Sequence, residues 1–255
     1  MTRPRKVKGY GWVPDLPDQR DHRYSVPAGV TSELPARVDL RPACPPVYDQ
    51  GELGSCTAQA IAGAIEFDQR RQDLAEFTPS RLFIYYNERL VEHSTDVDAG
   101  AMPRDGIKVV ASSGAPPEPD WPYDIERFAE RPPERAFRDA AKHRIALYQR
   151  LPRDLDQMRA CLASGFPFIL GFAVYESFEG PEVRRTGRMS MPRAGERVIG
   201  GHAVLAVGYV DRERRFIVRN SWGTAFGMDG YFTMPYQYLL QRPLSADFWT
   251  IRLVR

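Results

Sequence analysis

The sequence predicts an α+β fold made of a helical half and a sheet-rich half. Segments with helical periodicity dominate the chain up to about residue 145, and strand-like runs dominate the remainder. The 255 residues are 43% hydrophobic, which is enough for one large domain or a two-lobed unit with a sizeable core. We expect one domain over residues 37–255, with a helical lobe over about 47–145 and a β-rich lobe over about 146–250.

The first 36 residues differ from the rest of the chain in composition. They are rich in proline, aspartate, arginine and tyrosine and show neither a helical nor an alternating period. We interpret residues 1–36 as an extended N-terminal arm. Its basic start, MTRPRKVKGYGW, is followed by no apolar run, so an ordinary secretory signal is not indicated.

The strongest helical signal begins at Cys56, with the text CTAQAIAGAIEFDQRRQ. This stretch is rich in alanine, and four of its apolar residues recur at helical spacing. They are Ala58, Ile61, Ala62 and Ile65. Ser55 is expected to cap this helix, which places Cys56 in the first turn. Further helices are expected over 80–92, 104–111 and 153–163, the last after a proline-rich connection over 114–124.

Strand-like runs follow in the second half of the chain. They cover residues 166–175, 198–210, 215–219 and 230–234. The longest apolar stretch, 166–175, has 10 residues and contains Pro167 and Gly171. It is too short to span a bilayer and suits a buried strand, so we expect no membrane association.

Charge and cysteine content narrow the function classes. The 35 basic and 33 acidic residues give a formal charge of +2, which gives no reason to expect nucleic acid or an anionic membrane as the main partner. The three cysteines show neither metal-site spacing nor a disulfide-dense pattern. Because three cysteines cannot all pair within one chain, one of them is a candidate reactive thiol.

Cys56 is the best candidate for that thiol. It stands at a helix start behind Gly51 and Gly54, where backbone N–H groups and the helix dipole favour a thiolate. Cys44 precedes two prolines, and Cys161 falls on an apolar helix face, where it is expected to be a core residue. The alternative for Cys56 is a buried helix cysteine without chemistry.

A thiol nucleophile needs a base, and His202 is the histidine best placed to serve. His202 lies in VIGGHAVLAVGYV, at the mouth of an apolar strand behind two glycines, whereas the other three histidines lie among charges or at a helix end. Asn220 begins NSWG at the end of the next strand and could fix the imidazole tautomer, with Trp222 covering that hydrogen bond. A lone histidine in such a place would more often be structural.

Taken together, these residues resemble the papain and cathepsin family of cysteine peptidases. The resemblance rests on DQGELGSCTAQA, GGHAVLAVGY and RNSWGTAFGMDGYF, which occur in the family's order. Weaker similarity to the family is found over residues 34–42, 99–114 and 121–124. His202 follows Cys56 by 146 residues, within the family's interval of roughly 130–150, whereas Asn220 follows by 164, somewhat more.

The resemblance implies a papain-like two-lobed fold with the active cleft between the helical lobe and a β-barrel-like lobe. Gln50 and the Cys56 backbone N–H would form the oxyanion hole. The resemblance also implies five substrate-binding positions, with an apolar preference in the main pocket. These positions are Gly100, Met102, Ala173, Gly201 and Trp222. Neither a metal nor a cofactor is expected, since no H-E-x-x-H, Walker or dinucleotide glycine pattern is present.

Three positions depart from the family pattern. Leu53 replaces a cysteine of a family disulfide, which permits a reducing compartment, and Thr57 replaces the aromatic residue after the nucleophile. Gly201 replaces an aspartate that often precedes the catalytic histidine, which removes a negative charge. The missing disulfide and the absence of a signal favour a cytoplasmic location, with export by another route left open.

The sequence therefore predicts a cysteine endopeptidase, acting on a peptide or protein substrate and expected to be a monomer. The arm is expected to lie along the cleft and restrain access, as a short pro-segment would, and a surface-packed tail is the alternative. Two other functions stay open: transamidation by the same triad, and a latent binding protein whose arm fills the cleft permanently.

Overall fold

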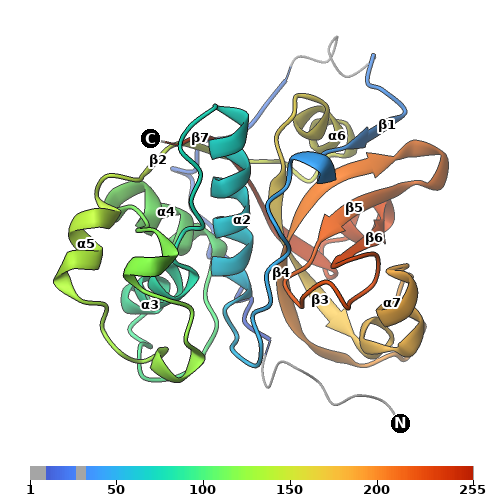
Figure 1. Cartoon of the computed structure of the whole chain (residues 1–255). Helices are drawn as coiled ribbons and strands as arrows, with labels where there is room; N and C mark the ends of the chain where they lie inside the picture. Colours follow the sequence, from blue (N-terminus) through green and yellow to red (C-terminus); the bar gives the residue numbers. More distant parts are fainter. Residues whose placement is uncertain (1–9, 27–32, 255) are drawn as a thin grey trace.

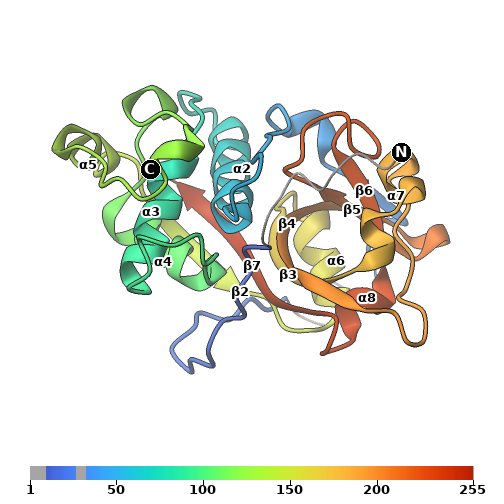
Figure 2. The ribbon, with the colours of Figure 1, turned by 90° about the horizontal axis from the view of Figure 1, so that it is seen from below.

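The computed structural model describes residues 10–26 and 33–254, which form a helical lobe and a sheet lobe on either side of α2 (Figure 1). The helical lobe contains α2 (Cys56–Arg71), α3 (Arg81–Val91), α4 (Pro103–Ser113) and α5 (Glu134–Ala140). Three further helices, α6 (Leu155–Ala163), α7 (Pro181–Thr186) and α8 (Tyr236–Leu240), accompany the sheet (Figure 2). Within the described part of the chain, none of the helices combines the length and apolarity needed to cross a membrane.

The sheet has seven strands, and every pair in it is antiparallel. Its order is β2-β7-β3-β4-β5-β6, with β1 paired to β4. The strands are β1 (Arg37–Asp39), β2 (Ile145–Arg150), β3 (Phe168–Tyr175), β4 (Val198–Val210), β5 (Arg215–Arg219), β6 (Tyr231–Pro235) and β7 (Ser245–Val254). Helices followed by antiparallel strands confirm the predicted α+β class.

Helix α2 is unusual in being buried on all sides. Every residue from Cys56 to Gln69 is buried, because α2 packs on α3 and α4 on one side and on β4 and β7 on the other. One apolar cluster joins α2 to Leu205 of β4 and Trp249 of β7. A second cluster fills the sheet lobe around β3, β5 and β6. The core thus runs through the lobe boundary and fixes the start of α2 against the sheet.

The lobes are not two consecutive parts of the chain. Strand β1, which precedes the helical lobe, pairs with β4. Trp249, Ile251 and Val254 of β7 pack in the cluster of the helical lobe. The segment at the N-terminal end of the domain therefore packs with the sheet lobe, and part of β7 at the C-terminal end packs with the helical lobe. Consecutive lobe ranges such as 47–145 and 146–250 do not describe this arrangement.

The expected cap of α2 is wrong in its detail. Ser55 is the N-cap residue, yet its hydroxyl makes no capping bond and instead contacts the hydroxyl of Tyr123 at 2.6 Å. The side chain of Gln59 donates to Ser55 Oγ at 3.2 Å. In contrast, Ser80 caps α3 and Asp154 caps α6 through their side-chain oxygens. The backbone of Ser55 has φ −91° and ψ 23°, outside the extended conformation that Ser80 and Asp154 adopt as caps, and its hydroxyl bonds to Tyr123 instead.

Arm residues 10–26 run across both lobes next to β7 and β2, as seen from below (Figure 2). Trp12 forms a parallel bridge with Ala101 of the helical lobe, and its N–H donates to the carbonyl of Gly201 on β4 at 3.0 Å. Farther along, Tyr24 N donates to the carbonyl of Arg150 on β2 at 2.9 Å. Residues 10–26 contain no helix and turn at residues 19–20; residues 1–9 and 27–32 lie outside the described residues.

Candidate active site

Cys56 is the first residue of α2, and its thiol is completely buried. The N–H of Ala203, the residue after His202, donates to Cys56 Sγ at 3.3 Å. This contact brings the start of the helix against the strand that carries the histidine. Burial raises the pKa of the Cys56 thiol to about 12, although N–H groups of Ala203, Gly11 and Thr57 act in the opposite direction.

His202 and Asn220 come together because β4 and β5 pair as a hairpin. His202 lies on β4, and Asn220 directly follows β5. His202 Nε2 is 2.8 Å from Asn220 Oδ1, and both side chains are buried. Trp222 stacks on the imidazole with ring centroids 4.9 Å apart and an interplanar angle of 27°. Burial lowers the pKa of His202 to about 4, while the bond to Asn220 acts to raise it.

Gln50 is held in one orientation by two hydrogen bonds. Its Nε2 donates to the carbonyl of Leu53 at 2.8 Å, and its Oε1 accepts from the hydroxyl of Ser221 at 2.6 Å. The backbone N–H of Gln50 also donates to the carbonyl of Ser221 at 2.9 Å. One N–H of the Gln50 amide is therefore left for another acceptor. Sequence reasoning missed Ser221, although it adjoins Asn220 in the NSWG text.

Residues 10–12 of the arm lie next to His202, Trp222 and Gly201. The ring of Tyr10 lies 6.2 Å from that of His202 and 6.3 Å from that of Trp222. Gly11 accepts a hydrogen bond from Ala101 N at 2.8 Å, and Trp12 donates to Gly201 O. The arm thus passes from the side of Trp222 towards the side of Gly201.

Comparison with known proteins decides the family. The model of the papain family of cysteine proteases matches residues 34–239. The chain belongs to this family. It is 39% identical to an uncharacterized peptidase C1-like protein, L477, of Acanthamoeba polyphaga mimivirus, over 97% of this chain and 88% of that protein.

Solved structures agree with that assignment. The crystal structure of xylellain, a cysteine protease from Xylella fastidiosa, matches with a TM-score of 0.90 and 44% identity over 100% of both chains. The fold is also similar to that of digestive procathepsin L 3 from Tenebrio molitor larval midgut, with a TM-score of 0.70 and 19% identity over 95% of this chain and 75% of that one. The papain-like fold and the cysteine-peptidase class expected from the sequence are thereby confirmed.

The five predicted substrate positions of this papain-family chain lie in different surroundings. Gly201 and Trp222 contact the arm, and a Cβ on Gly100 would lie 2.3 Å from Gly11 O. Met102 is the N-cap residue of α4, and its N–H donates to Glu92 at 2.7 Å. Ala173 pairs with Gly201 across β3 and β4.

Two residues beside Trp12 were not foreseen. A Cβ on Gly171 would lie 2.0 Å from the Trp12 indole, so this glycine makes room for the ring. Asp247 Oδ2 accepts from Trp12 Nε1 at 3.0 Å. The interruption of an apolar run by Gly171 was a visible signal, whereas nothing local in the sequence marked Asp247.

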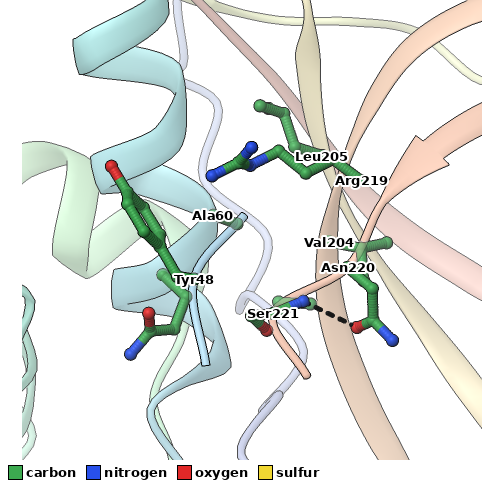
Figure 3. Close-up of a pocket in the computed structure, with 9 residues that line it drawn as sticks. Tyr48, Ala60, Val204, Leu205, Arg219, Asn220 and Ser221 are labelled. Carbon is green, nitrogen blue, oxygen red and sulfur yellow. Dashed lines mark hydrogen bonds between the residues drawn. The ribbon is translucent and has the colours of Figure 1, made fainter. Parts of the chain in front are cut away.

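A small pocket lies between α2 and strands β4 and β5 (Figure 3). It is lined by Tyr48, Gln59, Ala60, Ala203, Val204, Leu205, Arg219, Asn220 and Ser221. Ser221 N donates to Asn220 Oδ1 at 2.9 Å, so this oxygen has both Ser221 and His202 as partners. The pocket borders Asn220, and no described residue of the arm is among those that line it.

Proposed function

We propose that the protein is a cysteine endopeptidase in which Cys56 is the nucleophile, His202 the base and Asn220 the group that orients the base. The observation that carries the proposal is the contact of His202 Nε2 with Asn220 Oδ1, next to the contact of Ala203 N with Cys56 Sγ. Because Nε2 is engaged by Asn220, Nδ1 is the nitrogen left to exchange a proton with the thiol. Cysteine peptidases act on peptide or protein substrates.

The chemistry is an acyl transfer in two halves. The Cys56 thiol gives its proton to His202, and the thiolate attacks the peptide carbonyl carbon. The free N–H of the Gln50 amide and the Cys56 backbone N–H bind the oxygen that becomes negative. His202 then protonates the leaving nitrogen as the C–N bond breaks. In the second half His202 takes a proton from water, whose oxygen displaces the thiolate from the thioester and releases a carboxylic acid.

We also propose that the arm restrains this activity. Tyr10, Gly11 and Trp12 cover the imidazole and the thiol, which deprives both groups of water. With the thiol pKa raised to about 12 and the imidazole pKa lowered to about 4, the covered pair is uncharged at neutral pH. A thiolate–imidazolium pair is the reactive form, so the arm must move before catalysis.

The direction of the arm supports restraint over self-cleavage. By the family resemblance, Trp222 lies on the leaving-group side and Gly201 beside the acyl part of a substrate. A substrate would run from Gly201 towards Trp222, whereas the arm runs from Tyr10 at Trp222 to Trp12 at Gly201. Its peptide bonds are therefore reversed with respect to the catalytic groups.

A thiol-directed epoxide tests both parts of the proposal. We expect slow labelling of Cys56 in the full chain and labelling at least tenfold faster in a Tyr10→Ala, Trp12→Ala variant, since exposing the pair restores its charged form. Peptide hydrolysis should rise in parallel. Cys161→Ala serves as the matched control and should label like the parent, because Cys161 is buried away from His202. Absence of labelling at Cys56 in both forms would refute the peptidase mechanism, and equal rates would refute the restraint.

A further inference from the structure

A buried cluster of charged side chains holds the arm beyond the catalytic residues. The cluster, here called the arm latch, consists of Asp15 and Asp21 of the arm with Arg104, Arg150 and Asp247 of the body. Asp21 accepts from Arg104 Nε and Nη2 at 2.9 and 2.7 Å and from Arg150 Nη1 at 2.8 Å. Arg150 Nη2 also donates to Asp247 Oδ1 at 3.1 Å. The latch thus connects the arm to α4, β2 and β7.

The latch holds more negative than positive groups. Three carboxylates face two guanidinium groups, and the side chains of Asp15, Asp21 and Asp247 are only 0%, 4% and 1% exposed. Asp21 is the best-paired carboxylate, because both arginines bind it. The unbalanced charge therefore falls on Asp15 and Asp247.

Asp15 and Asp247 meet across the boundary between arm and body. Asp15 N donates to Asp247 Oδ2 at 2.9 Å, and the same oxygen accepts from Trp12 Nε1. Asp15 itself accepts from Arg104 N at 3.0 Å and from Trp249 Nε1 at 2.8 Å. Most of these partners are neutral N–H groups, which orient the carboxylates without cancelling their charge.

The surroundings of the pair do not correct the imbalance. The charged groups that interact with the pair from neighbouring elements are Glu92 after α3, Asp105 on α4 and Arg153 before α6. The arm also carries Asp18, Arg20 and His22, and α4 carries Lys108. Burial raises the pKa of Glu92 and of Asp105, and the charge of Asp15 adds to both shifts. Lys108 and Arg20 pair with Asp18, and Arg153 is a further cation among the described residues that interacts with Asp247.

Protonation behaviour follows from this arrangement. Burial raises the pKa of Asp247 to about 6, with repulsion from Asp15 as the next cause. Burial also raises the pKa of Asp15. Burial also acts to raise the pKa of Asp21, but the hydrogen bonds from Arg104 and Arg150 outweigh burial, so that the pKa of Asp21 is lowered. Of the latch carboxylates, Asp15 and Asp247 are thus the two whose pKa is raised in the docked arrangement.

We infer that the arm docks with uptake of about one proton, shared by Asp15 and Asp247, so that restraint of the peptidase is strongest in acid and relaxes towards neutral pH. This inference rests on the restraint proposed above. When the arm leaves, Asp15 enters water with an ordinary pKa of about 3.9, and Asp247 loses the neighbouring charge. The docked form therefore binds more protons between about pH 4 and pH 6, and docking weakens as pH rises through that window. The pKa of Asp21 is lowered in the docked form, so protonation of Asp21 weakens docking, and this effect is confined to lower pH.

Hydrogen exchange of the full-length Cys56→Ala chain tests the inference without any need for activity. The N–H groups of Trp12, Val13 and Tyr24 donate to carbonyls of the body and report on docking. Their protection, corrected for intrinsic exchange, should fall by roughly tenfold to a hundredfold between pH 4.5 and pH 7.5. Core N–H groups of β4 report global unfolding and should not show this fall.

Matched variants identify which carboxyl groups bind the proton that is taken up on docking. Asp247→Asn keeps an oxygen acceptor and suits the positive φ of 59° at this position, while leaving two carboxylates against two arginines. Asp15→Asn restores the same balance from the arm side, and either variant should flatten the pH profile. Asp139→Asn, at an exposed pair with Lys142, is the control and should leave the profile unchanged.

Several outcomes would overturn the inference. These are arm protection that is independent of pH in the parent, protection that rises with pH, and a profile that neither Asp247→Asn nor Asp15→Asn alters. Failure of the restraint proposal gives a different result. In that case arm protection would still fall with pH, but the rate of Cys56 labelling in the native chain would not follow it.

Discussion

His202 Nε2 and Asn220 Oδ1 lie 2.8 Å apart, although 18 residues separate them along the chain. The β4–β5 hairpin makes this contact, and the stacked Trp222 shields it from solvent. A buried amide in this position fixes the ring orientation and leaves Nδ1 available for proton transfer. We therefore treat Asn220 as a positioning residue for the imidazole.

Asn220→Ala should lower kcat/KM by roughly tenfold to a hundredfold, since a buried hydrogen bond to the base is worth about 1.5–3 kcal/mol. The effect should fall on kcat, because Asn220 does not touch the substrate in the proposed reaction. Peptide hydrolysis in a Trp12→Ala background measures it. Asn87→Ala, which removes another buried asparagine bonded to Phe83 O, is the control. Equal losses in the two variants would mean that Asn220 is merely structural.

Gly171→Ala should displace the arm. Its Cβ would lie 2.0 Å from the indole of Trp12, which cannot stay in place. We expect alkylation of Cys56 by iodoacetamide to accelerate by about tenfold or more, because the uncovered thiol and imidazole can again form the charged pair. Gly63→Ala on α2 is the matched control, since its Cβ finds no atom closer than 3.4 Å. The prediction fails if both variants alkylate at the parent rate.

Arg104→Met should loosen the arm from the opposite end. The variant leaves three buried carboxylates with Arg150 alone, and breaking a buried ion pair typically costs about 3–5 kcal/mol. Faster exchange at Trp12 and Tyr24 N–H and faster labelling of Cys56 are expected. Arg197→Met, which breaks a largely exposed pair with Glu176, should change neither measurement. Unchanged exchange in the Arg104 variant would show that the latch does not hold the arm.

Glu88→Gln should change the pH dependence of stability. Glu88 is fully buried, and burial raises its pKa well above the usual range, while the bond from Thr57 Oγ1 at 2.8 Å acts to lower it. A raised pKa in the folded state means that its contribution to stability is present in acid and is lost as pH rises. Gln retains an acceptor for Thr57 and does not titrate.

Urea unfolding at pH 5, 7 and 9 measures this effect. The free energy of unfolding of the Glu88→Gln variant should increase relative to the parent as pH rises. Glu130→Gln, at an exposed position paired with Arg127, should track the parent throughout. A difference between the Glu88 variant and the parent that stays constant with pH would contradict a buried protonated carboxyl at this site.

Much of the fold could be predicted because its signals are local. The helix expected from Cys56 and the strand expected over 198–210 correspond to α2 and β4. The hydroxyl of Ser55 was assigned wrongly, since helix-start patterns do not reveal that Tyr123, 68 residues away, competes for it. The burial of Glu66 and Asp68 on α2 was also invisible, because it depends on segments outside the helix, such as that of Tyr48, whose hydroxyl donates to Glu66.

By itself the sequence determined the residue types of the site, their order and spacing, and the presence of an extended arm before the domain. The sequence was sufficient to name four candidate residues, because each lies in a short motif near a helix start or a strand end. They are Cys56, His202, Asn220 and Gln50. Only the tertiary structure decided that Trp12 fits against Gly171 and reaches Asp247, 235 residues away, and that Asp15 and Asp21 meet Arg104. The physical reason is that the local sequence determines backbone conformation and side-chain chemistry. Burial and charge balance depend instead on which distant segments pack together away from water.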